Sequence, residues 1–397
     1  MRGRSEARQR WVVPLALTVM TGFGVILYGF SVYSTGGAAG SEYSTTVLSV
    51  AYGGSVFVGG LLAFPVGRVS DRHGIRRIVT GGAIAGCLGL AAFSAAREPW
   101  QVVVSWWALI GPAQAMIYYE PAYVAIDQWG LARDRAKNLA TITFIGGLAG
   151  IAFIPGAAWL VDLTGWRNAV LILGVVLLLV GLVTAVVFLP RGAARSTGEE
   201  AQLPSVPGRP TRERRFILYT LALALMLLST QGVIAHRIAR FEETGFSISE
   251  ISIWAAVASA LSLPGRWVAP RLAERYGPIR VQATIALLVA ASIGLMVDGT
   301  DGWQMTGHFF LFGLAFGALL PLRAMVMGDW YSGPAYGRIM GAQWTPVVLV
   351  AASGPVAMGV LRDASGGYAL PAVIITVLFV GAGGAVVASG RAPQPPM

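Results

Sequence analysis

Residues 67–77, GRVSDRHGIRR, place four arginines and one aspartate between two long apolar runs. Glycine stands at both ends of the acidic part, at Gly67 and Gly74. Glycine adopts backbone conformations that other residues avoid, so the chain can leave one helix and enter another within a few residues. The stretch therefore predicts a short basic connection, residues 68–77, between two membrane-spanning helices.

The composition of the whole chain supports a membrane location. The chain has 397 residues, of which 55% are hydrophobic and 12% charged, with a mean hydropathy of +0.65. A soluble domain carries about 25% charged residues, so this chain is expected to be an integral membrane protein. The net charge of +10 is assigned to loops on one side of the membrane, and no nucleic-acid partner is expected. One cysteine and three histidines offer no disulfide or metal-site spacing, so we expect no metal and no cofactor.

Apolar runs of spanning length recur along the chain. A membrane-spanning helix needs about 20 apolar residues. The twelve predicted spans are 11–34, 44–67, 78–97, 101–128, 137–161, 167–189, 214–238, 248–270, 280–298, 303–328, 338–361 and 367–389. Residues 190–213 are rich in Pro, Gly, Ser and charge and are typical of a linker. The expected fold is thus all-α, with six-helix halves at 1–189 and 214–397 joined by this linker.

Arginines and the single lysine gather on one side of these spans. The positive-inside rule then predicts that both termini and the linker are cytoplasmic. An even number of spans also requires both termini to share one side. We expect a multi-pass protein of the cell membrane whose lipid partner is the bilayer itself.

The two halves partly repeat each other at a shift of about 200 residues. The segment Arg68-x-x-Asp71-Arg72-x-Gly74 matches Arg271-x-x-Glu274-Arg275-x-Gly277. Asp127-Gln128-Trp129 similarly falls near Asp329-Trp330. Two related halves are a known plan of secondary transporters, in which the substrate site lies between the halves.

With these residues in view, the chain resembles the major facilitator superfamily over its whole length. The family's loop between the second and third helices has the pattern Gly-x-x-x-Asp-Arg-x-Gly-Arg-Arg. The matching residues here are Gly67, Asp71, Arg72, Gly74, Arg76 and Arg77. The second copy departs from the pattern, with Pro270 in place of the first glycine and Glu274 in place of the aspartate.

The resemblance also implies roles for this motif. Asp71 is expected to face the N-terminus of the eleventh helix, near 338–341, where free N–H groups favour a carboxylate. Arg72 or Arg76 is expected to pair with Asp127, so that the contacts form in one conformation and break in another. Glu274 and Arg275 form the second copy of the motif. The alternative is that the arginines only set the topology.

Few charged residues lie within the predicted spans, and each is a functional candidate because burying a charge in a bilayer is costly. The stretch from Arg266 to Glu274 resembles the eighth helix of monocarboxylate transporters and their bacterial relatives. That resemblance implies that Arg266 binds a substrate carboxylate. The alternative is a snorkelling side chain, because the basic Arg271 follows five residues later.

Glu120 and Arg323 lie at similar depth in the fourth and tenth predicted helices. They are expected either to form a salt bridge across the halves or to pair separately within each half. Glu120 is also the candidate proton carrier, because burial raises the pKa of a carboxylate. Tyr118 and Tyr119 are candidate hydrogen-bond donors to the substrate. The remaining binding candidates are Arg323 and His236, the latter in a segment that also resembles the monocarboxylate branch.

These observations favour a secondary active transporter that works by alternating access and acts as a monomer. The favoured substrate is a small, monocarboxylate-like organic anion, coupled to protons or exchanged. No phosphate-binding loop is present in the sequence, which argues against ATP-driven transport. The alternative is proton-coupled efflux of drugs or other hydrophobic compounds. A receptor or an intramembrane enzyme is a remote alternative, because either would need an appended soluble domain or a catalytic cluster.

Overall fold

The computed structural model describes residues 10–119, 121–122, 125–126, 135–190, 210–331 and 336–390. Glu120 and Asp127 therefore lie outside the described residues. Of Gly67, Asp71 and Arg72 only the backbone is described. The regular structure of the described ranges is helical throughout. The chain divides into two compact units, residues 1–197 with 247–256 and residues 198–246 with 257–397.

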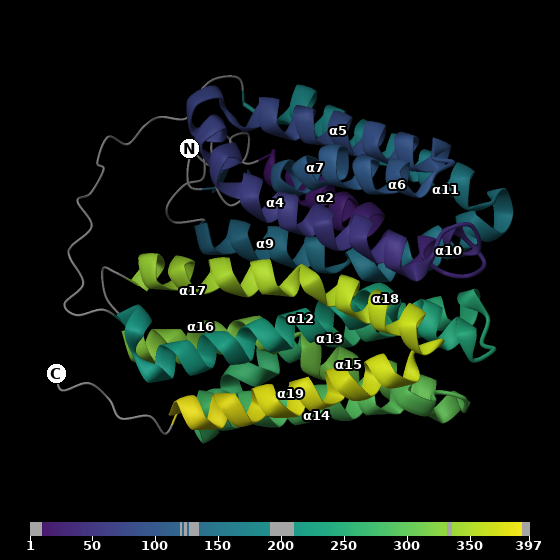
Figure 1. Ribbon diagram of the computed structural model, residues 1–397. Coiled ribbons are helices and arrows are strands. Elements are labelled where there is room, and N and C mark those ends of the chain that lie inside the picture. The colour runs from purple at the N-terminus through teal and green to yellow at the C-terminus, as the bar shows by residue number, and fades with distance from the viewer. Residues whose placement is uncertain are drawn as a thin grey trace. The chain divides into compact units, whose positions relative to one another are not determined.

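The first unit is built from helices that are mostly apolar on all sides. Its elements are α2 (Val12–Gly22), η1 (Phe23–Tyr28), α3 (Gly29–Tyr33), η2 (Ala39–Ser41), α4 (Thr45–His73), α5 (Ile75–Ala95), α6 (Pro99–Ser105), η3 (Trp106–Ile110), α7 (Gly111–Ile117), α9 (Arg135–Gly147), α10 (Ala149–Thr164), α11 (Trp166–Val183) and η5 (Thr184–Phe188). Within this unit α5 packs against α11 and α7, and α4 packs along α7 and α6 (Figure 1).

The second unit is also built from mostly apolar helices. Its elements are η6 (Pro210–Arg212), α12 (Arg214–Glu243), α13 (Ile248–Tyr276), α14 (Pro278–Asp298), α15 (Gly302–Phe316), α16 (Leu319–Tyr331), α17 (Tyr336–Ala351), α18 (Ser353–Ser365) and α19 (Ala369–Gly390). Residues 248–256 of α13 belong to the first unit and the rest of that helix to the second. Here α14 packs against α19 and α15, and α12 packs against α19, α17 and α18 (Figure 1).

The predicted spans agree closely with the helices. Among the described residues, eleven helices are long and apolar enough to cross a membrane. Each lies within a few residues of a predicted span. The remaining predicted span, 101–128, contains residues outside the described ranges. The all-helical, multi-span prediction is therefore confirmed for the part of the chain that the structure describes.

The connection predicted at residues 68–77 is wrong in its length. Helix α4 continues through the charged stretch to His73, and only Gly74 separates it from α5. Gly74 has φ 80° and ψ 149°, a conformation that side-chain-bearing residues rarely adopt. Arginine is a good helix former, so a change from apolar to charged residues marks the edge of the membrane and not the end of the helix.

The second unit turns in the same way. Helix α13 runs to Tyr276, Gly277 has φ 86°, and α14 begins at Pro278. The backbone N–H of Gly277 donates to the carbonyl of Ala273, at 2.9 Å, and so closes the last turn of α13. The repeat that was visible in the sequence thus holds for the backbone conformation of these two glycines, Gly74 and Gly277.

The first prediction tests this single-residue turn. Gly277→Ala forces a side chain into a positive-φ conformation, which costs about 1–3 kcal/mol. We expect a lower thermal unfolding midpoint for the detergent-purified protein. The matched control is Gly294→Ala in the interior of α14, where a β-carbon meets nothing within 4 Å. If both variants shifted the midpoint equally, the turn would not be the cause.

Candidate functional site

The fourth span of the first unit is interrupted in its apolar stretch. Helix α7 stops at Ile117, and Tyr118 has φ −80° and ψ −159°, an extended conformation. The N–H of Tyr118 still donates to the carbonyl of Gln114, at 3.2 Å. Non-helical backbone at membrane depth is tolerated only where it is buried in protein or lines a cavity. The interruption therefore lies where the backbone is buried in protein or lines a cavity.

The corresponding span of the second unit is interrupted as well. Helix α15 ends at Phe316, Gly317 and Ala318 form a turn, and α16 resumes at Leu319. The two interruptions are about 200 residues apart, the same shift that relates the repeated motifs. Paired interruptions in corresponding spans of the two halves are a strong indicator of a binding site in transporters.

The fifth spans share a second pair of interruptions. In the first unit Leu148 separates α9 from α10, and in the second unit Ala352 separates α17 from α18. Leu148 has φ −75° and ψ −7°, and Ala352 has φ −60° and ψ −24°. In both units, turn or bend residues thus interrupt the fourth and the fifth spans.

Aromatic side chains surround the interruption of the first unit. The rings of Tyr118 and Phe23 stack with centroids 3.9 Å apart and an interplanar angle of 15°. The ring of Tyr119 lies 4.9 Å from Phe23, tilted by 41°. Phe23 begins the π-helical segment η1, and such segments recur at functional sites. All three side chains are partly accessible, and we call them the aromatic cluster.

Close packing fixes the first span beneath this cluster. A β-carbon at Gly24 would clash with the ring of Phe153 on α10. A β-carbon at Gly22 would lie 3.0 Å from the side chain of Ile117, at the end of α7. Glycine at these positions lets η1 approach its neighbours closely, which holds Phe23 under Tyr118.

In the second unit, Arg323 follows the interruption and is held by two neighbours. Its Nε–H donates to Oε1 of Gln343 on α17, at 2.9 Å. Its guanidinium lies 4.4 Å from the ring centroid of Trp344, within cation–π range. The amide nitrogen of Gln343 in turn contacts the sulfur of Met327, at 3.2 Å. Arg323 is therefore a half-buried cation whose guanidinium group is held in one orientation.

Arg266 lies in α13 between Pro264 and Pro270, and its side chain is half buried. Among the residues that the structure describes, its side chain has no ion pair and no hydrogen bond. One helical turn away on either side are Ser262, Leu263, Ala269 and Pro270, none of them acidic. Arg266 is thus a cation inside a span that no described acid neutralises.

The helix that carries Arg266 is fixed by direct backbone contact with α15. A β-carbon at Gly265 would lie 2.7 Å from the carbonyl oxygen of Leu314, and one at Gly313 would lie 2.5 Å from that of Ala258. A β-carbon at Gly317 would clash with the carbonyl of Ser262. Small residues allow such close approach in membrane helices. Gly313 and Gly317 thus allow close packing of α15 and the turn that follows it against α13.

His236 lies near the C-terminal end of α12 and is fully buried. Its Nε2 lies 3.0 Å from the carbonyl of Pro355, which can only accept, so Nε2 carries the proton. Its Nδ1 then accepts from the hydroxyl of Tyr368, also at 3.0 Å. A substrate would have to displace one of these partners to bind the His236 ring.

The motif residues lie at the helix ends that meet at Gly74 and Gly277. Arg76 is half buried in the first turn of α5. In the second copy, Glu274 and Arg275 are exposed near the end of α13, and the guanidinium of Arg275 lies 5.2 Å from the ring of Tyr276.

Three contributors were missed in the sequence, namely Phe23, Gln343 and Trp344. Phe23 sits within an apolar run, where an aromatic residue ordinarily indicates packing. Its one signal is that glycine stands on both sides, at Gly22 and Gly24. Gln343 and Trp344 adjoin Pro346 inside α17, and a polar side chain in a span was the available signal.

The fold and the paired interruptions define a class: a multi-pass membrane protein with the repeated halves of secondary transporters. The model of the Major Facilitator Superfamily matches residues 12–297, and the chain belongs to this family of membrane transporters. The family resemblance predicted from residues 67–77 is confirmed, and with it the twelve-helix fold. The match is to a family of transporters and not of enzymes.

Named relatives are distant but extensive. The chain is 22% identical to "MFS-type transporter pynF" of Aspergillus niger, over 69% of this chain and 62% of that protein's length. It is 23% identical to "Monocarboxylate transporter 13" of Bos taurus, over 81% of this chain and 76% of that protein. The solved structure of nucleoside transporter NupG has a TM-score of 0.78 at 14% identity, covering 97% of this chain and all of that one. The last likeness concerns the fold alone.

The second prediction concerns the support of Arg323. Gln343→Leu removes the acceptor of the Arg323 Nε–H, and a hydrogen bond to a charged group is worth about 1.5–3 kcal/mol. We expect the apparent affinity for the transported solute to fall about tenfold. The measurement is initial uptake into proteoliposomes at several concentrations.

A double-mutant cycle separates this role from general damage. The variant Arg323→Lys lacks the planar guanidinium and its Nε–H. Gln343→Leu should therefore lower the apparent affinity little in the Arg323→Lys background. An equal loss in both backgrounds would mean that Gln343 acts independently of Arg323.

Proposed function

We propose that this protein is a secondary active transporter of a small, monocarboxylate-like organic anion and works by alternating access. The observation that carries the proposal is the pair of half-buried arginines, Arg266 and Arg323, within spans of the second unit. A charge inside a span is costly, so such residues ordinarily serve the transported solute or its coupling ion. Two cationic side chains favour an anionic substrate.

The chemistry of the guanidinium suits a carboxylate. It stays charged when buried and offers parallel N–H donors that match both carboxylate oxygens. For Arg323, the bond to Gln343 and the stacking on Trp344 orient the guanidinium in advance. For Arg266, the backbone contact of Gly265 with Leu314 holds the carrying helix in place. The relative named Monocarboxylate transporter 13 supports the same substrate class.

Tyr118 and Tyr119 are proposed to contact the remainder of the substrate. Their rings form an apolar surface with Phe23, while their hydroxyls are potential donors. Glu120, beside them in sequence, is proposed to carry the coupled proton and to pair with Arg323 in one conformation. An inward proton gradient should then accelerate uptake, and Glu120→Gln should remove that acceleration.

The topology and the oligomeric state are also part of the proposal. Both termini are proposed to be cytoplasmic in the cell membrane, with the linker 190–213 between the halves 1–189 and 214–397. The transporter is proposed to act as a monomer.

A second candidate function is efflux of a hydrophobic compound. The aromatic cluster of Phe23, Tyr118 and Tyr119 favours it, because stacked rings bind apolar molecules without selecting for charge. Under this alternative Glu120 is the principal charge of the site and the arginines are structural. Substrate panels that include a hydrophobic cation therefore distinguish the two functions.

The third prediction tests the substrate class through Arg266. Arg266→Lys keeps the charge but loses the planar fork, so apparent affinity for a carboxylate should fall about tenfold. The measurement is uptake of labelled monocarboxylates by wild type and variant in the same vesicles. The matched control, Arg280→Lys, changes an exposed arginine at the start of α14 and should leave uptake unchanged. Equal uptake by Arg266→Lys would indicate a snorkelling side chain.

The fourth prediction concerns the motif of residues 67–77. Asp71→Asn removes the charge while keeping the size, and we expect slower transport at unchanged membrane insertion. Topology does not depend on this acid, because acidic residues contribute little to the positive-inside rule. Wild-type rates at equal expression would leave the motif with a topological role only.

A further inference from the structure

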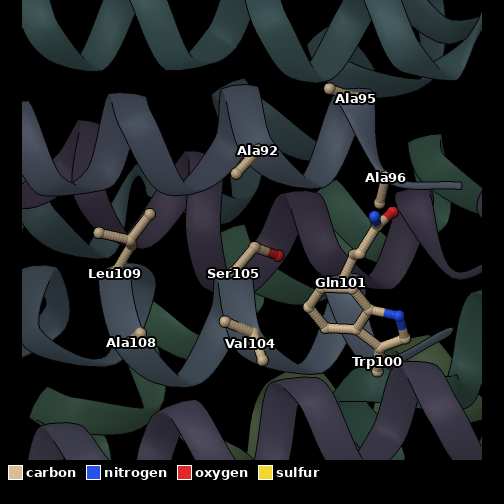
Figure 2. A pocket seen from close by; sticks show the side chains of 9 residues that line it. All are labelled: Ala92, Ala95, Ala96, Trp100, Gln101, Val104, Ser105, Ala108 and Leu109. Carbon is tan, nitrogen blue, oxygen red and sulfur yellow. The ribbon is translucent and has the colours of Figure 1, made fainter. Parts of the chain in front are cut away.

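A groove on the first unit lies between the last turns of α5 and the first turns of the following span. It has a volume of about 310 Å³, and alanines of α5 form one wall while α6 and η3 form the other (Figure 2). Ala92 and Ala95 come from α5, and Val104, Ala108 and Leu109 come from the opposite wall. Small residues along one wall create the hollow, because larger side chains would fill it.

The polar groups in the lining are already used within the protein. The hydroxyl of Ser105 donates to the carbonyl of Val102, at 2.8 Å. The amide oxygen of Gln101 accepts from the backbone N–H groups of Arg97 and Glu98, at 2.7 and 3.1 Å, and so caps α6. The groove therefore offers a largely apolar surface, which suits hydrocarbon better than water.

One end of the groove is polar and amphipathic. Trp100 lines it with 63% of its surface exposed, and Arg97 and Glu98 beside it are also exposed. Exposed tryptophan is typical of the level of lipid head groups, where its ring is apolar and its N–H is hydrated. An arginine next to a glutamate complements a head group with one negative and one positive charge, and the Glu98 carboxylate also accepts from the backbone N–H of Gln101 in the capping box of α6.

We propose that this groove binds one zwitterionic phospholipid. An acyl chain lies along the alanines of α5, the phosphate contacts Arg97, and the ammonium group contacts Glu98. The helices that form the groove belong to or adjoin the membrane span Ile75–Ala95, so the apolar part faces the hydrocarbon of the bilayer. The proposal does not depend on the identity of the transported solute.

The test counts lipids that stay bound to the detergent-purified full chain by native mass spectrometry, with phosphatidylethanolamine as the added probe. Ala108→Leu fills the groove from its accessible wall, and displacing two or three methylenes should lower occupancy of one bound lipid by about tenfold or more. Ala291→Leu is the matched control, an exposed alanine of α14 in the other unit. It should retain the lipid.

A second substitution tests recognition of the lipid head group. Arg97→Gln should weaken retention of phosphatidylethanolamine while the thermal unfolding midpoint stays at the wild-type value. Equal retention by wild type, Ala108→Leu and Arg97→Gln would overturn the proposal. A change from dimer to monomer in Ala108→Leu would also overturn it, because the groove would then hold a second copy of the chain.

Discussion

A chain inside a bilayer must satisfy its backbone hydrogen bonds internally, and this constraint shapes most of the structure. It explains why the described spans are helical and why both repeated turns are reduced to a single glycine, at Gly74 and Gly277. It also makes each departure from helix informative. The spans depart at Tyr118 and at Gly317–Ala318, where other parts of the same unit approach closely. At these departures backbone groups leave the regular helical hydrogen-bond pattern.

The two units use the same interruption for different chemistry. In the first unit the interruption at Tyr118 brings two tyrosines against Phe23, and the result is an aromatic surface. In the second unit the turn at Gly317 precedes Arg323, which is oriented by Gln343 and Trp344. The backbone symmetry is therefore kept while the side chains differ. The two halves thus present different side chains at corresponding interruptions, aromatic rings in the first and an oriented arginine in the second.

The sequence was sufficient for the spans, the repeat and the family, because hydropathy and a dense Gly-Asp-Arg motif depend on local composition. The interruption at Tyr118 was not predicted, although Pro121, three residues later, lacks the N–H that would bond to the carbonyl of Ile117, where α7 ends. The sequence also placed the end of α4 too early, since hydropathy changes at the membrane edge while hydrogen bonding continues to His73. Arg266 and Arg323 could be identified because a charge within a span is rare. Phe23 and Trp344 could not, because an aromatic residue in an apolar run is common.

The ends of the two units show how far the repeat extends into side-chain contacts. In the first unit Glu42 accepts from the indole N–H of Trp166, at 3.0 Å, and from Arg167, at 2.5 Å. In the second unit Glu243, at the corresponding position, accepts from Arg362 at 2.8 Å, and that guanidinium lies 5.7 Å from the ring of Tyr368. The acid and the aromatic residue occupy matching positions, but the arginines come from different places in the two helix pairs. Exposed ion pairs of this kind contribute little stability on their own. Non-equivalent arginines thus form an ion pair at this end in both halves. The interruptions of the fourth and fifth spans, in contrast, recur at a shift of about 200 residues in the backbone itself.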